Sequence, residues 1–184
     1  VLVRGGTSSV GRAAIDIVKD MGCTVLATTR SEFKAEVLRQ AGGDHVIIDT
    51  GEIASRVRQI VPDGVQSVLE LVGRYNTIVD SMNTIAPRGV ICLVGFLGDE
   101  WDYQGLPYPP STVHLTMYSS ETIETTRYTP ILQEIVKRVE AGRYQPNIYK
   151  VFPFEELIEA HRTMEKNHAT GKLVILVENP SSGE

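Results

Sequence analysis

The sequence lacks the motifs of several common enzyme classes. It contains no His-Glu-x-x-His, no Cys-x-x-Cys and no cluster of cysteine and histidine residues, so we expect no metal site. No Gly-x-Ser-x-Gly elbow is present, which argues against hydrolase chemistry. No Gly-Lys followed by serine or threonine occurs, which excludes a Walker A loop.

Positive charge, cysteine and long apolar runs are also scarce. The 184 residues carry a formal net charge of -5, which argues against nucleic acid or an anionic membrane as the main partner. No segment is long and apolar enough to span a bilayer. Cys23 and Cys92 each lie in or beside an apolar run, and we interpret them as buried free thiols in a protein of cytoplasmic location.

Short apolar strands alternate with amphipathic helices along the chain. The predicted strands are 1–4, 24–28, 45–48, 67–72, 90–94, 113–118, 148–152 and 173–177, and the predicted helices are 10–21, 32–41, 53–61, 77–86, 129–141 and 153–167. Segment 98–111, rich in proline, glycine and aromatic residues, predicts a loop. This alternation indicates an α/β protein with a doubly wound Rossmann fold, in which a six-stranded, mainly parallel sheet has helices on both faces.

A glycine-rich segment, GGTSSVG, lies between the first strand and the first helix. In that helix the apolar residues recur at helical spacing, at Val10, Ala13, Ala14, Ile17, Val18 and Met21. A tight turn there directs backbone N–H groups and the positive end of the helix dipole toward an anion. We therefore predict a phosphate-binding loop in which three hydroxyls add hydrogen bonds and the last glycine lets the helix lie close to the strand; its residues are Gly5, Gly6, Thr7, Ser8, Ser9, Val10 and Gly11.

The end of the second strand indicates which dinucleotide would bind. An NAD-selective site usually has an acid there, but the sequence reads Thr28-Thr29-Arg30-Ser31, with Lys34 one turn later. Arg30, Ser31 and Lys34 could bind the 2′-phosphate of NADPH through charge-assisted hydrogen bonds, and we count Thr29 beside them as a cofactor-binding residue. The alternative is that Arg30 and Lys34 are solvated surface charges.

Five segments, taken in order, resemble the medium-chain dehydrogenase/reductase superfamily, in particular its quinone oxidoreductase (zeta-crystallin-like) branch, often labelled zinc-binding alcohol dehydrogenase. They are VLVRGGTSSVGRAAIDIVKDMGCTVLATTR, DHVIID, VLELVG, RGVICLVGFLG and ATGKLVILV. That branch commonly has Ala-x-x-Gly-x-x-Gly in its phosphate loop, and here Gly5, Ser8 and Gly11 stand at those positions. The resemblance also implies that two further loops border the nicotinamide, namely Leu71-Val72-Gly73 and Val94-Gly95-Phe96-Leu97. Short-chain dehydrogenases are a weaker match, because none of the seven tyrosines has a lysine four residues later.

The resemblance implies hydride transfer from NADPH to a small-molecule quinone, enone or aldehyde. In this family a GroES-like catalytic domain precedes the cofactor domain, so we expect residues 1–184 to be an excised NADP-binding domain. Residues 145–184 are expected to pack toward that missing domain, and the isolated domain is expected to bind cofactor without turnover. We assign no catalytic residue, and we expect a homodimer formed through strand 113–118. A non-catalytic nucleotide-binding sensor or interaction module is the alternative.

Overall fold

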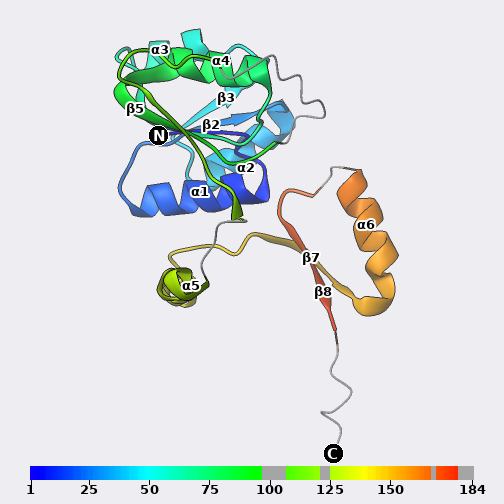
Figure 1. Ribbon diagram of the computed structural model, residues 1–184. Coiled ribbons are helices and arrows are strands. Elements are labelled where there is room, and N and C mark those ends of the chain that lie inside the picture. The colour runs from blue at the N-terminus through cyan, green and yellow to red at the C-terminus, as the bar shows by residue number, and fades with distance from the viewer. Residues whose placement is uncertain (97–106, 121–124, 167–168, 178–184) are drawn as a thin grey trace, which may run out of the picture. The chain divides into compact units, whose positions relative to one another are not determined.

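The computed structural model describes residues 1–96, 107–120, 125–166 and 169–177. The chain divides into two compact units, Val1–Gln145 and Pro146–Glu184 (Figure 1). Most of the predicted loop 98–111 lies outside the described residues, as does the predicted site residue Leu97. Among the helices that are described, none is long and apolar enough to cross a membrane.

The first unit is built on a six-stranded sheet in which every neighbouring pair is parallel, with the order β3-β2-β1-β4-β5-β6. This arrangement confirms the predicted doubly wound Rossmann fold. Its strands are β1 (Leu2–Arg4), β2 (Leu26–Thr29), β3 (His45–Ile48), β4 (Val65–Glu70), β5 (Ile85–Leu93) and β6 (His114–Met117). Its helices are α1 (Ser9–Asp20), η1 (Glu32–Lys34), α2 (Ala35–Gln40), α3 (Ala54–Ile60), α4 (Tyr75–Thr84) and α5 (Thr125–Glu140).

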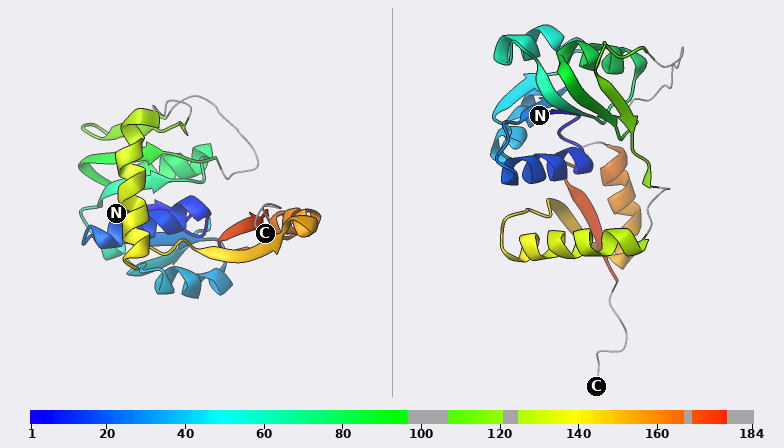
Figure 2. Two further views of the ribbon diagram at one scale, coloured as in Figure 1. Left: turned by 90° about the horizontal axis from the view of Figure 1, so that it is seen from below. Right: turned by 60° about the vertical axis from the view of Figure 1, so that its left-hand side comes forward.

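Helices cover both faces of this sheet, with α1 and α2 on one side and α3 and α4 on the other (Figures 1 and 2). Successive residues of β1 point to opposite faces. Leu2 belongs to the core under α3 and α4, which includes Val57 and Ile78, whereas Val3 packs with Ile15 on the α1 and α2 side. Both faces of the central strands are therefore buried, which explains their nearly continuous apolar sequence.

Helix α1 lies where the sequence predicts it, but its buried face differs from the predicted one. Ile15 is fully buried and Val18 is partly buried, whereas Val10 and Met21 are 51% and 71% exposed. Gly11, Ile15 and Val18 lie at positions i, i+4 and i+7 and so form one stripe. The buried stripe therefore begins at the glycine, which apolar periodicity alone does not count.

The boundary between α4 and β5 also differs from the prediction of a helix through residue 86 and a strand from residue 90. Helix α4 ends at Thr84, and β5 begins at Ile85, which pairs with Val65. Ala86 precedes Pro87, and the residue before a proline is sterically disfavoured in the helical region. The helix therefore ends two residues before the predicted end at residue 86.

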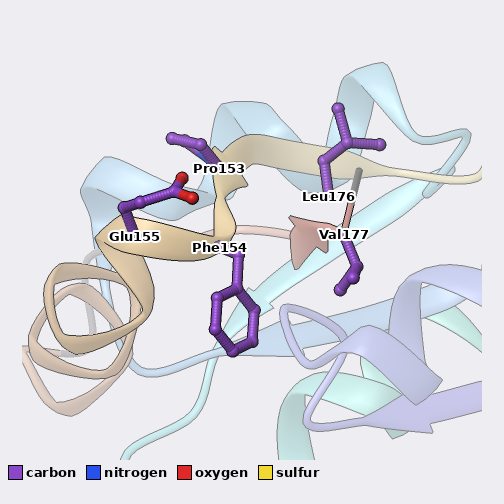
Figure 3. A pocket seen from close by; sticks show the side chains of 5 residues that line it. All are labelled: Pro153, Phe154, Glu155, Leu176 and Val177. Carbon is purple, nitrogen blue, oxygen red and sulfur yellow. The ribbon is translucent and has the colours of Figure 1, made fainter. Parts of the chain in front are cut away.

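The second unit contains a two-stranded parallel sheet of β7 (Ile148–Pro153) and β8 (Lys172–Leu176), joined through η3 (Phe154–Glu156) and α6 (Leu157–Glu165). Phe152 and Ala160 are buried in it. Figure 3 shows a hollow in this unit, lined by Pro153, Phe154, Glu155, Leu176 and Val177. Because this lining has a single ionisable side chain, we assign no chemistry to the hollow. The expected packing of residues 145–184 toward a further domain stays a prediction.

The two cysteines are free, as expected, but neither is buried. Cys23 and Cys92 are both partly exposed. Cys23 follows Gly22 at the end of α1, and Cys92 lies in β5 with partial exposure despite its apolar neighbours. The expectation of fully buried thiols is therefore wrong.

Candidate functional site

The glycine-rich segment forms a tight turn between β1 and α1 that is held by β2. Gly5 has a φ of 88°, a conformation that favours glycine. Its N–H donates to Thr28 Oγ1 (3.0 Å), and the N–H of Gly6 donates to Thr28 O (2.9 Å). The N–H of Ser8 donates to Gly5 O (3.1 Å) and closes the turn. One residue of the second strand thus anchors the start of the predicted phosphate loop.

Ser8 is the N-cap of α1. Its Oγ accepts a hydrogen bond from the N–H of Gly11 (3.0 Å), and its φ of -71° and ψ of 162° are open to any residue. This backbone conformation explains why serine can stand where relatives commonly have glycine. Because Ser8 Oγ accepts this bond, its hydroxyl hydrogen remains available to donate to a phosphate oxygen, as the predicted contact requires. Thr7 and Ser9 are partly exposed, and Val10 is exposed in the first turn.

Gly11 marks the close approach of α1 to the turn. A Cβ on Gly11 would lie 2.6 Å from Gly5 O and 2.8 Å from Gly6 Cα, both backbone atoms. Such separations are well inside van der Waals contact. The helix N-terminus can therefore lie against the turn only because residue 11 has no side chain.

The tip of β2 presents the residues that are predicted to select the cofactor. Thr29 is buried, and its Oγ1 accepts from the N–H of Ser31 (3.2 Å). Arg30 is exposed, and Ser31 and Lys34 are partly exposed, with Ser31 preceding η1. Because β1 and β2 are parallel, this tip and the glycine-rich turn lie at the same edge of the sheet.

The loops after β4 and β5 contact each other at that edge. A Cβ on Gly73 would lie 2.4 Å from Gly95 O, and a Cβ on Gly95 would lie 2.7 Å from Leu71 O. The Leu71 side chain is buried in the core with Val3, so the predicted contact of Leu71 with a cofactor would be made by its backbone. The two loops that carry the predicted residues Val72, Gly73, Val94, Gly95 and Phe96 therefore lie against each other, and the two glycines permit this contact.

Sequence reasoning missed a buried ionic cluster beneath this edge, the Arg4 cluster, formed by Arg4, Asp49, Glu70, Asp80 and Ser81. Arg4, at the end of β1, is 0% exposed. Its Nε and Nη2 donate to the two carboxylate oxygens of Asp49 (2.8 and 3.0 Å). Its Nη1 donates to Asp80 Oδ2 (2.8 Å) and Ser81 Oγ (3.1 Å). One guanidinium thereby joins β1 to the end of β3 and to α4.

Glu70, also 0% exposed, is the register partner of Arg4 on β4. Its Oε2 lies 4.0 Å from Arg4 Nε and accepts from Ser81 Oγ (2.6 Å). Burial raises the pKa of Glu70, and the hydrogen bond from Ser81 and the charge of Arg4 only partly oppose this effect. Burial would also raise the pKa of Asp49, but the hydrogen bonds and charge of Arg4 outweigh it and hold that pKa low. Within the described ranges, no three His, Cys, Asp or Glu residues gather to hold a metal.

The comparisons with known proteins agree with this geometry. The family model for zinc-binding dehydrogenases matches residues 41–175. The chain belongs to that family of oxidoreductases, and its predicted place in the medium-chain dehydrogenase/reductase superfamily is confirmed.

Individual relatives are distant but are matched along most of this chain. A zinc-type alcohol dehydrogenase-like protein of Staphylococcus aureus is 28% identical over 183 residues, which covers 95% of this chain and 54% of its own length. Human quinone oxidoreductase is 26% identical over 183 residues, with coverages of 96% and 54%. A mycobacterial protein solved in complex with NADPH is 25% identical with a TM-score of 0.79, with coverages of 96% and 56%. The chain thus spans about half the length of the curated relatives it matches.

Proposed function

We propose that this chain binds NADPH and serves as the cofactor-binding part of an oxidoreductase. The observation that carries the proposal is the close approach at Gly11, which brings the N-terminus of α1 against a glycine-rich turn at the carboxyl edge of the sheet. The NADPH complex of the mycobacterial relative supports the choice of ligand. In the proposed site the pyrophosphate lies on this turn, and Arg30, Ser31 and Lys34 hold the 2′-phosphate.

Cofactor preference tests the assignment at the tip of β2. The chain should bind NADPH more tightly than NADH in calorimetry, and Lys34→Ala should weaken NADPH by about 1–3 kcal/mol while changing NADH little. Lys137→Ala, which removes an exposed lysine from α5, is the matched control and should change neither affinity. Equal affinities of the unmodified chain for the two cofactors would contradict the proposal.

The proposed reaction is hydride transfer from NADPH to a quinone, enone or aldehyde. The nicotinamide supplies the hydride, and the protein supplies binding, orientation and exclusion of water. The acceptor must be held about 3–3.5 Å from the hydride-donating carbon. We place the residues that hold it in the half of the relatives that this chain does not match, and we therefore expect the 184-residue chain to bind NADPH without consuming it. Loss of NADPH absorbance with a panel of acceptors would contradict that expectation.

We also propose a homodimer formed through strand 113–118. Strand β6 is the last strand of the sheet order, and Met117 is 54% exposed. The N–H of Tyr118 donates to Leu93 O on β5, so in this parallel pair the N–H of Met117 faces the open edge. Light scattering should give twice the chain mass of 20.3 kDa, and Met117→Pro should halve it because proline removes an edge donor. A monomeric unmodified chain would contradict the proposal.

A further inference from the structure

The Arg4 cluster connects the two halves of the dinucleotide site through hydrogen bonds. At one end, Asp49 accepts from Thr28 Oγ1 (3.4 Å), which itself accepts from the N–H of Gly5 at the start of the glycine-rich turn (3.0 Å). At the other end, Glu70 Oε1 accepts from the N–H groups of Val72 (2.9 Å) and Gly73 (3.1 Å). Arg4 lies between these ends.

The hydrogen bonds of Glu70 join the loop after β4 to helix α4. Its Oε1 receives both loop N–H groups, and its Oε2 receives Ser81 from α4, so every hydrogen bond of its side chain fixes the β4–α4 connection. Gly73 has a φ of 73° and lies against the backbone of Gly95, so the same connection also contacts the loop after β5. The position of the Val72 and Gly73 backbone thus depends on the Glu70 carboxyl group.

We propose that Glu70 is a positioning residue for the nicotinamide half of the cofactor, an inference that rests on the proposed NADPH function. A doubly wound sheet binds one mononucleotide over each half. The glycine-rich turn and the tip of β2 lie in the half of the sheet that would bind the adenosine half of the cofactor. Val72 and Gly73 lie in the other half of the sheet, which begins at β4.

The ionic character of this cluster supports a positioning function rather than a contribution to stability alone. Buried ion pairs are often no more stable than well-packed apolar residues of similar volume. Here three carboxyl groups surround one guanidinium. Among the described residues, every buried side-chain nitrogen and oxygen atom has a hydrogen-bond partner. Hydrogen bonds, unlike apolar contacts, fix the direction of each backbone N–H at the loop.

The test compares two ligands that differ only in the nicotinamide half. Calorimetry on the 184-residue chain measures the dissociation constants of NADPH and of 2′-phospho-ADP-ribose, which lacks nicotinamide. Glu70→Ala should weaken the binding of NADPH about tenfold more than the binding of the fragment. The reason is that the loop loses the hydrogen bonds that position it, an effect comparable to about one charge-assisted hydrogen bond. Glu70→Gln should retain most of the NADPH affinity that Glu70→Ala loses, because its amide oxygen can still accept from Val72 and Gly73.

Two further variants separate positioning from stability. Thr84→Val removes a buried hydrogen bond to Ser81 O within α4 but touches neither loop, so it should lower the melting temperature without changing the ratio of the two affinities. Ser81→Ala removes the hydroxyl that donates to Glu70 and should shift the ratio in the same direction as Glu70→Ala, but less. If Glu70→Ala does not fold, Ser81→Ala decides the question.

The outcomes distinguish this inference from the proposed function. If the unmodified chain binds neither ligand, the proposed function is wrong. If it binds both and Glu70→Ala weakens them equally or not at all, the function stands and the positioning inference is overturned. Equal affinity of the unmodified chain for NADPH and the fragment would also overturn the inference, since the second half would then hold no nicotinamide. A ratio shifted by Thr84→Val as much as by Glu70→Ala would do the same.

Discussion

Replacing Gly11 by alanine is the smallest change that tests the phosphate-binding turn. The new Cβ would lie 2.6 Å from Gly5 O, so the turn and helix must separate by roughly 0.8 Å to reach ordinary contact at about 3.4 Å. Overpacking of this kind costs about 1–3 kcal/mol. Alanine regains about 1 kcal/mol of helix propensity relative to glycine. The net loss in the free energy of unfolding should therefore be about 0–2 kcal/mol, and the variant should fold.

Gly11→Ala should reduce the free energy of NADPH binding more than it reduces the free energy of unfolding. A backbone N–H that bonds a phosphate oxygen at about 2.9 Å no longer does so after a displacement of roughly 0.8 Å. Losing one such charge-assisted bond costs about 2 kcal/mol, or about thirtyfold in affinity. Gly11→Ala should thus bind NADPH at least about thirtyfold more weakly in calorimetry while remaining folded by circular dichroism.

The matched control is Ala13→Val, which adds bulk to an exposed position of the same helix. It should leave NADPH affinity unchanged, because residue 13 does not face the turn. Normal NADPH binding by Gly11→Ala would refute the reasoning, since the phosphates would then be held elsewhere. Equal losses in both variants would show that affinity follows helix stability rather than the geometry of the turn.

Three further substitutions test the second half of the site and the cluster beneath it. Gly95→Ala brings a Cβ within 2.7 Å of Leu71 O, so it should separate the two loops and weaken NADPH by about tenfold in calorimetry. Asp49→Asn breaks a buried ion pair with Arg4 and should lower the free energy of unfolding in urea by about 3 kcal/mol. The raised pKa of Glu70 gives a stability contribution that is full below its ordinary value of 4.5 and is lost as the pH rises through the raised value. Glu70→Gln should therefore flatten the decline of the unfolding free energy above pH 4.5, measured by urea titrations at several pH values.

The order and type of the elements could be predicted because strand and helix periodicities are local properties of the chain. Most strands of the main sheet contain a short apolar run bounded by turn residues, and the helices between β1 and β5 require these strands to run parallel. The buried face of α1 could not be predicted from apolar residues alone. Gly11 occupies the core side for steric reasons, which turns Val10 outward and Ile15 inward.

The Arg4 cluster was missed because its members come from four separate segments, and Asp49 and Asp80 become neighbours of Arg4 only after the sheet forms. The sequence nevertheless holds a signal for it. VLVR and VLEL each carry one charged residue, of opposite sign, in an otherwise apolar segment of four residues. A charge in a strand that is buried on both faces needs a partner of opposite charge. In the strand order of this doubly wound sheet, β1 and β4 are neighbours. Pairing the two charges in register, as Arg4 and Glu70 are, would have located the cluster directly under the glycine-rich turn.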